Sequence, residues 1–518
     1  MSAPIANRQT ADVAATPVEQ RGLLTVGVML ATVMQILDTT IANVALPHMQ
    51  TALGATADTI TWVLTSYIIA SAVAIPITGW LSDRYGSRPL FLVAVVGFVL
   101  SSMLCGIATN LEEMVGFRVL QGISAAFINP LSQTVMMDIS PPSKQARAMA
   151  IWGMGIMVGP IMGPVLGGWL TENFSWRWCF YVNVPFGIVT LAILWSLLPA
   201  KPLRPRPFDL TGFALIAIAI TAFQVMLDRG QQLDWFDSWE VRIEAGIALS
   251  AGWMFAVHMA TAKHPMFERA LLKNRNMATG LIFMMTMGLV MFATMALLPP
   301  MLQRIWKYPV MDAGLLLAPR GVGTLITMFF AGKLIGRVDP RWMVGTGLAV
   351  AALSLWEMTT WSLEMDYRWI VFSGLIQGLG LGLAFMPLNL IAFGTLDPIH
   401  RTEGTSLLNL VRSIGASVGV SVTTTLLARN LQTSHADLVG HITPFSLPSM
   451  DPSASERLMS AGDTIMAMID AEVNRQALMI AYLDDFKLMA IVTLCAVPLV
   501  MLLRRPPKPQ GPQHVAME

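Results

Sequence analysis

The chain has 518 residues, of which 54% are hydrophobic and only 13% are charged, and its formal net charge is +1. A typical soluble domain is about 25% charged, so this composition excludes an ordinary soluble protein. The near-neutral balance and the lack of a basic cluster argue against a nucleic-acid partner. The three cysteines, Cys105, Cys179 and Cys495, lie in or at separate apolar runs, and their spacing matches neither a disulfide framework nor a metal site.

Apolar runs recur from Gly22 to Leu503. A run of about 18 or more apolar residues is long enough to cross a bilayer as a helix. We therefore predict an all-α integral membrane protein in the lipid bilayer, with fourteen spans. They lie near residues 23–45, 60–81, 90–109, 112–136, 147–170, 178–198, 210–227, 243–261, 277–300, 312–335, 342–361, 369–395, 405–427 and 485–503. A count of twelve would require that two of these runs do not cross.

The loops between the predicted spans differ in basic residues from one side to the other. Most Lys and Arg fall on one side, and the short loops of the other side carry only Arg177, Arg229, Arg304, Lys307 and Arg368. Basic loops stay in the cytoplasm, so we expect both termini there. Residues 1–21 and 505–518 would be cytoplasmic tails, and residues 1–20 lack the features of a signal peptide.

An internal repeat divides the chain into related halves. Residues 79–88 match residues 332–341 after a shift of 253 positions, residues 120–132 match residues 376–389 with one insertion, and Gly159 and Gly163 correspond to Gly415 and Gly419. We predict two six-helix bundles with two helices inserted between them. The predicted units are residues 22–200, 201–275 and 276–504. Two such bundles facing each other are typical of a transporter with its site between them near the midplane.

These segments carry a family resemblance over nearly the whole chain. Residues 79–88, 118–122 and 155–168 resemble the signatures of loop 2–3, helix 4 and helix 5 of the major facilitator superfamily, and residues 37–47 resemble the helix 1 signature of its fourteen-helix drug:proton antiporters of the EmrB/QacA type. Residues 227–236 are similar to the loop after helix 7 in EmrB-like members. The resemblance implies a proton-driven multidrug exporter of hydrophobic compounds in a bacterial inner membrane. It implies no cofactor beyond the proton gradient.

Asp38 and Arg118 are the predicted proton-coupling residues. A charge at the centre of a bilayer costs about 2.5–3.5 kcal/mol, so Asp38, within the first span, calls for an explanation. Burial favours the neutral form of a carboxyl group and a nearby cation favours the charged form, so Asp38 could bind and release a proton. We expect it to face a cavity, and it is the leading candidate for the acid partner of Arg118. A structural hydrogen bond for Asp38 and snorkelling of Arg118 are the alternatives.

The resemblance also implies a cytoplasmic latch. Its residues are Gly79, Asp83, Arg84, Gly86 and Arg88, and Asp83 would meet the positive N-terminus of the helix that starts near Gly404. The second copy of the motif has Gly336 in place of Asp83, so the latch would be one-sided. A role in topology alone is the alternative.

A stripe of glycines lies in the fifth span, with prolines beside it. The stripe residues are Gly155, Gly159, Gly163 and Gly167, and the prolines are Pro160 and Pro164. Small residues let membrane helices approach closely, and prolines can bend a helix. In the family this pattern marks antiporters, so we expect an antiporter hinge at the interface that moves between the two bundles. An ordinary helix contact is the alternative.

Polar residues inside other spans are candidates for the substrate cavity. They are Gln35, Trp62, Gln377, Asn389, Asn409 and Arg412. We expect neither Arg320 nor Arg412 to face lipid. Relatives of the QacA type place acids where this chain has Asn409 and Arg412, which argues against specificity for dicationic drugs.

The segment between the last two spans, residues 429–484, is polar and falls on the periplasmic side of the predicted topology. The resemblance to EmrB-like proteins implies that it contacts a periplasmic adaptor that works with an outer-membrane channel. A solvated connector is the alternative.

The sequence is compatible with three other functions. The first is an exporter of one metabolite, such as a fatty acid or a siderophore-like compound, and the second is a uniporter or importer on the same scaffold. The third, an intramembrane enzyme, would need a nucleophile with its base or a metal cluster, and the scattered histidines make it the weakest. No phosphate-binding P-loop pattern is present, which argues against ATP as the energy source.

Overall fold

The computed structural model describes residues 14–56, 59–335, 337–394, 396, 398–441 and 462–504. Within them the regular structure is helical, apart from a single bridge between Ile335 and Val338. Residues 1–13 and 505–518 of the predicted tails, Gly336 of the second loop motif, and residues 442–461 lie outside the described residues.

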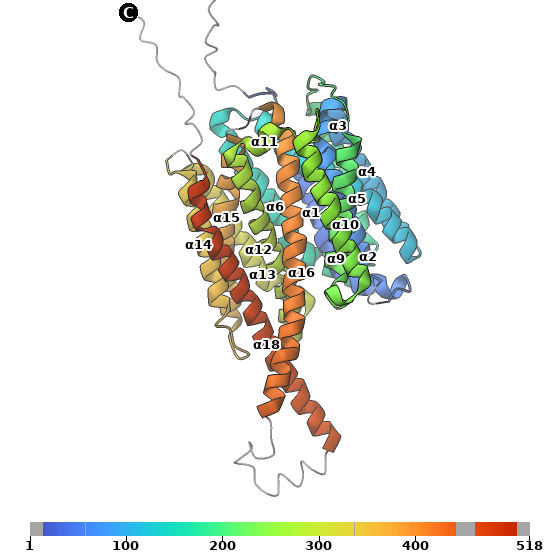
Figure 1. Ribbon diagram of the computed structural model, residues 1–518, viewed down its shortest axis with the longest axis vertical. Helices are drawn as coiled ribbons and strands as arrows, with labels where there is room; N and C mark the ends of the chain where they lie inside the picture. Colours follow the sequence, from blue (N-terminus) through green and yellow to red (C-terminus); the bar gives the residue numbers. More distant parts are fainter. Residues whose placement is uncertain are drawn as a thin grey trace, which may run out of the picture.

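The N-terminal half forms a six-helix bundle (Figure 1). Its helices are α1 (Arg21–Ala52), α2 (Trp62–Ala74) continued by η1 (Ile75–Ile77) and α3 (Thr78–Tyr85), α4 (Ser87–Ile107), α5 (Leu111–Asp138), α6 (Gln145–Asn173), and α7 (Trp178–Tyr181) with α8 (Asn183–Leu197). Gly86 joins α3 to α4 with a φ of 94°, a conformation that side chains with a Cβ rarely adopt.

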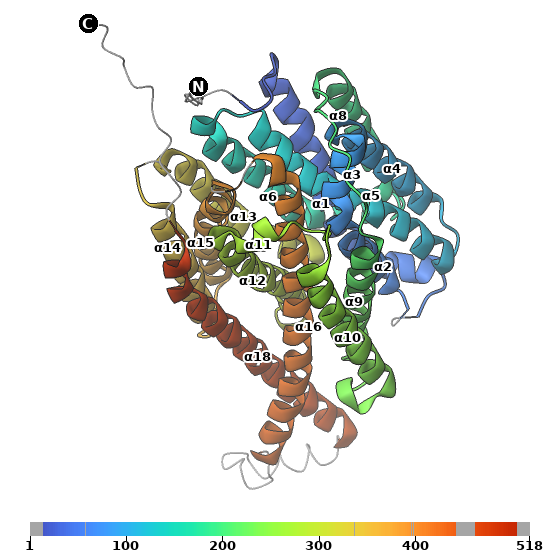
Figure 2. The same cartoon turned by 45° about the horizontal axis from the view of Figure 1, so that its top comes forward.

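The C-terminal half forms a second bundle. Its helices are α12 (Arg275–Ile305), α13 (Val310–Leu334), α14 (Pro340–Met358), α15 (Tyr367–Gly394), α16 (Arg401–His441) and α18 (Gly462–Ala496). Between the bundles the chain forms α9 (Leu210–Arg229), α10 (Trp239–Thr261) and the short α11 (Arg269–Lys273). Helix α9 packs against α2 of one bundle and α16 of the other, and α10 packs against α9 (Figure 2).

The same packing pattern occurs in both bundles. In the N-terminal bundle α1 packs on α6 and α8, and α5 lies between α2 and α4. In the C-terminal bundle α12 packs on α16 and α18, and α15 lies between α13 and α14. The predicted repeat is therefore confirmed as a repeat of helix contacts, with α9 and α10 as the insertion.

All fourteen predicted spans are helical, and within the described residues twelve helices are long and apolar enough to cross a membrane. The two outside that set are α5 and α14. Helix α5 is less apolar because it carries Arg118, Gln121 and Gln133, which are buried within the protein. The number fourteen and the cytoplasmic position of both termini stay predictions. Helix α1 begins on the side of the molecule where α3 and α11 lie, and the described chain finishes on the same side (Figure 1).

Residues 429–484 are polar, and the composition of the second part, residues 453–485, is compatible with a helix; the structure forms helices at both ends of this segment. Helix α16 continues to His441, and α18 begins at Gly462. At 1.5 Å per residue the 41 residues of α16 extend for about 60 Å, twice the roughly 30 Å of a bilayer core. The two helices therefore project beyond the bundles at the end opposite α3 and α11 (Figure 1).

Candidate functional site

A buried ion pair lies inside the N-terminal bundle. The Nη1 atom of Arg118 on α5 lies 2.8 Å from Oδ2 of Asp38 on α1, and both side chains are 0% exposed. The other carboxylate oxygen, Oδ1, accepts hydrogen bonds from Gln121 Nε2 at 2.9 Å and Asn183 Nδ2 at 2.8 Å. Asp38 thus has three donors from two other helices.

The guanidinium of Arg118 is held on several sides. Its Nη1 also donates to Gln121 Oε1 at 2.7 Å, and its Nε donates to the carbonyl of Val63 at 3.0 Å. The ring of Tyr67 lies 4.4 Å from the guanidinium carbon. Arg118 Nη2 is buried without a hydrogen-bond partner among the described residues. A buried unpaired donor is unfavourable, so this nitrogen lacks the compensation that Nε and Nη1 of the same guanidinium have.

The expectation that Asp38 faces a cavity is wrong in this conformation. Asp38 is 1% exposed and surrounded by α5 and α8, so it faces neither lipid nor the space between the bundles. The pairing with Arg118 is present. If Asp38 were protonated, the ion pair would be lost, and α1, α5 and α8 would be joined by weaker contacts because hydrogen bonds to charged groups are the stronger ones.

Asp83 meets the C-terminal bundle indirectly. Its carboxylate Oδ2 lies 3.2 Å from Nε of Arg206 in the linker before α9, and Nη1 of Arg206 lies 3.4 Å from Oε2 of Glu403 in the first turn of α16. The prediction of a direct contact between Asp83 and the helix N-terminus is therefore wrong, because Arg206 and Glu403 stand between them. Gly79 sits against Glu403, where an added Cβ would lie 3.2 Å from the Glu403 Cβ.

The two remaining basic residues of the predicted latch do not reach the other bundle through the described contacts. Arg88 Nη2 donates to the carbonyl of Trp195 at 2.6 Å within its own bundle, and Arg84 is exposed. Instead, Asp138 at the end of α5 makes a direct tie to α16. Its Oδ1 accepts from Arg401 Nη1 at 3.1 Å, and its Oδ2 pairs with Lys201. We call this end of the molecule, with Asp138, Arg206 and Arg401, the basic end.

The predicted position of the glycine stripe is also wrong. An added Cβ at Gly159 would lie 2.5 Å from Ile36 Cγ2, and one at Gly163 would lie 2.0 Å from Thr40 Oγ1, so the stripe packs on α1 within its own bundle. Gly155 and Gly167 also face α1. The opposite face of α6 meets α13, where Gly314 lies against Pro164. The hinge role stays a prediction; α6 is continuous through Pro160, whose side chain lies outside the description.

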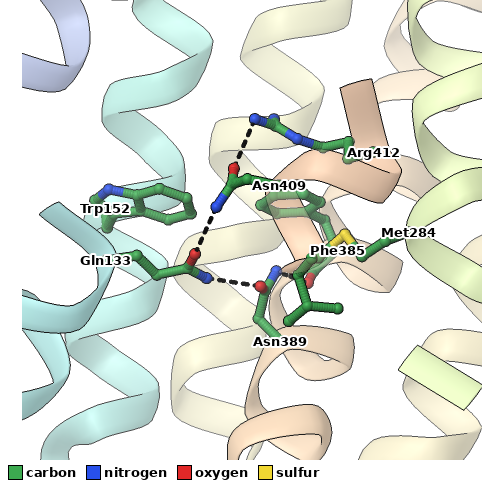
Figure 3. A pocket seen from close by; sticks show the side chains of 8 residues that line it. Gln133, Trp152, Met284, Phe385, Asn389, Asn409 and Arg412 are labelled. Carbon is green, nitrogen blue, oxygen red and sulfur yellow. Dashed lines mark hydrogen bonds between the residues drawn. The ribbon is translucent and has the colours of Figure 1, made fainter. Parts of the chain in front are cut away.

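A pocket lies between the bundles. It is lined by Gln133 and Trp152 of the N-terminal bundle and by Met284, Phe385, Asn389, Leu408, Asn409 and Arg412 of the C-terminal bundle (Figure 3). The space between these side chains is about 0 Å³ for a water molecule, so the bundles are closed around this pocket. The ring planes of Trp152 and Phe385 are 15° apart, with centroids separated by 6.4 Å.

Carboxamide side chains join the bundles across this pocket. Gln133 Nε2 donates to Asn389 Oδ1 at 2.7 Å, and Gln133 Oε1 accepts from Asn409 Nδ2 at 3.4 Å. Asn409 Oδ1 accepts from Arg412 Nη2 at 2.9 Å (Figure 3). Of the predicted cavity residues, the structure thus places three together: Asn389, Asn409 and Arg412.

The other three predicted cavity residues lie elsewhere. Gln35 is buried in α1, and Trp62 is half-buried at the start of α2. Gln377 is enclosed in the C-terminal bundle, with its Nε2 3.5 Å from Thr294 Oγ1. None of the three is among the residues that line the pocket.

Several functional residues were not singled out from the sequence. Gln121 could have been found, because it lies three residues after Arg118 and so on the same helix face. Asn183 could have been noted as a polar residue within an apolar run. Gln133 carried the same signal, whereas Trp152 and Asp138 carried none, since their partners come from later parts of the chain.

Similar proteins share this architecture. The family model described as Major Facilitator Superfamily matches residues 28–427. The fatty acid resistance protein FarB of Neisseria gonorrhoeae is 36% identical, over 95% of this chain and 97% of its own length. The multidrug export protein EmrB of Haemophilus influenzae is 35% identical, over 95% and 97%. The protein of the same name from Escherichia coli K12 is 34% identical, over 93% and 95%.

Solved structures match in fold. The human transporter MFSD10 has a TM-score of 0.61 at 14% identity, with 93% of this chain and 99% of that chain covered. The proton:xylose symporter XylE has a TM-score of 0.59 at 13% identity, with 91% and 94% covered. At these identities the likeness concerns the arrangement of helices.

Proposed function

Because the chain belongs to the Major Facilitator Superfamily, we propose that it is a proton-driven exporter of hydrophobic and amphipathic compounds across the bacterial inner membrane. Relatives that align along nearly their whole length are named multidrug export proteins. The observation that carries the proton coupling is the fully buried pair of Asp38 and Arg118. A family of membrane transporters gives no reason to assign catalytic residues.

The proposed mechanism begins with a proton on Asp38. Protonation removes the ion pair that joins α1 to α5, and the exchange is complete when the proton leaves on the cytoplasmic side. We place the basic end in the cytoplasm, following the distribution of Lys and Arg. In this conformation the ties at Asp138 and Arg206 close that end, so release of the proton has to be accompanied by their opening.

The available energy is sufficient for export. A proton that crosses a potential of about 100 mV supplies about 2.3 kcal/mol, and a gradient of one pH unit supplies about 1.4 kcal/mol. Together they support a concentration ratio in the hundreds, since about 1.4 kcal/mol corresponds to a factor of ten.

The test is uptake of lipophilic dyes by proteoliposomes with an imposed pH gradient. We expect the wild-type protein to accumulate dye and the Asp38→Asn variant to fail, although it still binds dye. The matched control is Thr39→Val, one position along the same helix. Gln35→Glu cannot serve as this control, because it adds a charge. Equal accumulation by wild type and Asp38→Asn would remove Asp38 as the proton carrier. Unchanged flux without a gradient would favour a uniporter.

We also propose that the projecting parts of α16 and α18 contact a periplasmic adaptor protein, which in turn engages an outer-membrane channel. The support is their length beyond the bundles (Figure 1). The two helices meet at His435 and Asp470, whose side chains are 3.0 Å apart. Beyond this contact, Val439 and Met468 are 46% and 68% exposed.

The contact between His435 and Asp470 defines a deletion that leaves the bundle intact. Residues 436–469 can be replaced by a short Gly/Ser linker, because the two cut ends are adjacent. Buried residues of α18, from Val473 onward, are retained. We expect the intact chain to capture a co-expressed periplasmic adaptor protein, and the shortened chain to lose it while its dye binding is unchanged. Equal capture by both would contradict this contact.

A further inference from the structure

The C-terminal bundle holds two arginines inside predicted spans without an acidic partner. Arg320 on α13 and Arg412 on α16 have no carboxylate oxygen within 4 Å among the described residues, whereas Arg118 is paired with Asp38. A charged group at this depth is unfavourable unless it is compensated. These two cations therefore lack the compensation that Arg118 has.

Arg412 belongs to the pocket between the bundles. Only its Nη2 makes a described hydrogen bond, to Asn409 Oδ1 at 2.9 Å, and the side chain is only partly buried. The remaining N–H groups of the guanidinium have no acceptor among the described residues. All other pocket-lining side chains are neutral, so the pocket carries one positive charge and no negative one (Figure 3).

The second arginine lies further from the basic end. Arg320 Nη2 donates to the carbonyl of Met291 on α12 at 3.3 Å. Met284, which lines the pocket, precedes Met291 by seven residues on the same helix, so the two levels are separated by about 10 Å at 1.5 Å per residue. Two uncompensated positive charges therefore lie at successive depths of the C-terminal bundle.

We propose that the pocket selects amphipathic anions, with Arg412 as the residue that binds the anionic group. A guanidinium presents a planar fork of donors that matches a carboxylate or sulfonate. The rings of Trp152 and Phe385 supply apolar walls for the body of the ligand. This inference rests on the proposed export function and specifies the substrate class of the same site.

Binding of an anion at this position also has a consequence for coupling. Asn409 holds Arg412 and at the same time contacts Gln133 of the other bundle. If a bound anion draws the guanidinium of Arg412 away from Asn409, Asn409 loses its hydrogen bond to Arg412. The contact of Asn409 with Gln133, which joins the bundles, then lacks that support. Export of an anion from a cell whose interior is negative is further assisted by the membrane potential.

The experiment uses two probes of fixed and opposite charge on the same aromatic body: 2-naphthalenesulfonate and (2-naphthyl)trimethylammonium. The full-length protein is reconstituted in proteoliposomes with an imposed pH gradient, and binding is measured in parallel in detergent. We expect accumulation of the sulfonate, and an Arg412→Gln variant that accumulates about tenfold less of it, as loss of a charge-assisted hydrogen bond implies. Arg412→Lys keeps the charge and should recover part of the loss.

The controls separate charge from folding. Arg368→Gln removes an arginine whose side chain is 79% exposed and should change neither probe. Arg320→Gln should weaken the sulfonate less than Arg412→Gln does. Sulfonate binding that is equal in wild type and Arg412→Gln would overturn the proposal, as would equal losses for both probes. Accumulation of the ammonium compound alone leaves the export function standing and rejects the anion preference, whereas accumulation of neither probe rejects both.

Discussion

The two halves of the molecule share their packing but differ in their charge. In the N-terminal half Gln121 contacts Asp38 on the first helix of its bundle, and Arg118 completes an ion pair. In the C-terminal half the corresponding residue, Gln377, contacts Thr294 on the first helix of its bundle. The Oγ1 atom of Thr294 in turn lies 3.9 Å from the Sδ atom of Met489 on α18. Asp38, by contrast, accepts a hydrogen bond from Asn183 on α8.

This difference indicates a division of labour. The acid that we propose as the proton carrier, Asp38, is enclosed in one half with its own counter-ion, whereas the buried acid of the other half, Asp485, has no hydrogen-bond partner among the described residues. The unpaired arginines are in the other half, and one of them reaches the pocket. Equivalent helix frameworks can thus serve different chemistry, because the packing depends on small residues and shape while the function depends on a few polar side chains at the same depth.

The largest effect is expected from breaking the ion pair of the N-terminal half. Asp38→Asn leaves Arg118 buried without a counter-ion, which costs about 3–5 kcal/mol. Adding Arg118→Gln should restore most of the stability but not the proton-driven transport. Thermal unfolding in detergent and dye uptake by proteoliposomes measure the two properties. If the double variant were as unstable as Asp38→Asn alone, the instability would not come from an uncompensated charge on Arg118.

A smaller loss is expected from the glycine contacts, and here the halves should behave alike. Gly163→Ala and Gly419→Ala both force a methyl group against the first helix of their bundle, at Thr40 and at the Leu289 carbonyl. Overpacking of this kind costs about 1–3 kcal/mol. Gly168→Ala is the matched control, since nothing lies within 4 Å of an added Cβ there. A clear difference in melting temperature between the Gly163→Ala and Gly419→Ala variants would show that the packing at these two glycines is not equivalent.

The tie between the halves at the basic end should have an effect of similar or smaller size. Asp138→Asn weakens the bonds to Arg401 and Lys201, and a hydrogen bond to a charged group contributes about 1.5–3 kcal/mol. A cysteine placed at Thr405, which is 0% exposed, should then react faster with a soluble maleimide. The background needs Cys495→Ser, because Cys495 is the exposed free cysteine of the described chain. An unchanged rate would mean that Asp138 does not hold this end closed.

The smallest effect is expected at the C-terminal counterpart of Asp38. Thr294→Val removes a hydroxyl that bonds chiefly to its own helix, at the Val290 carbonyl, so we expect a stability change below about 1 kcal/mol. Proton-driven transport should stay at the wild-type level. A loss of transport comparable to that of Asp38→Asn would show that both halves take part in coupling.

Local properties of the chain were sufficient for much of the fold. The length and apolarity of each run predicted a helix at all fourteen positions, and the spaced matches between residues 79–88 and 332–341 predicted the two bundles. The extension of α16 was missed because its polar second half, up to His441, reads as a connector when hydropathy alone is considered. In this structure α18 packs along α16, and this contact supports the extension.

The sequence by itself determined that this chain forms apolar helices in two related sets and that Asp38 and Arg118 are charges in need of compensation. Apart from the pair of Asp38 and Arg118, only the tertiary structure decided which groups meet. It enclosed Asp38 in its own bundle, turned the glycine stripe toward α1, and put Arg206 between Asp83 and α16. Hydropathy reports whether a segment prefers lipid to water, whereas contacts depend on the rotation and depth of each helix, which are set jointly by all the helices that pack against it.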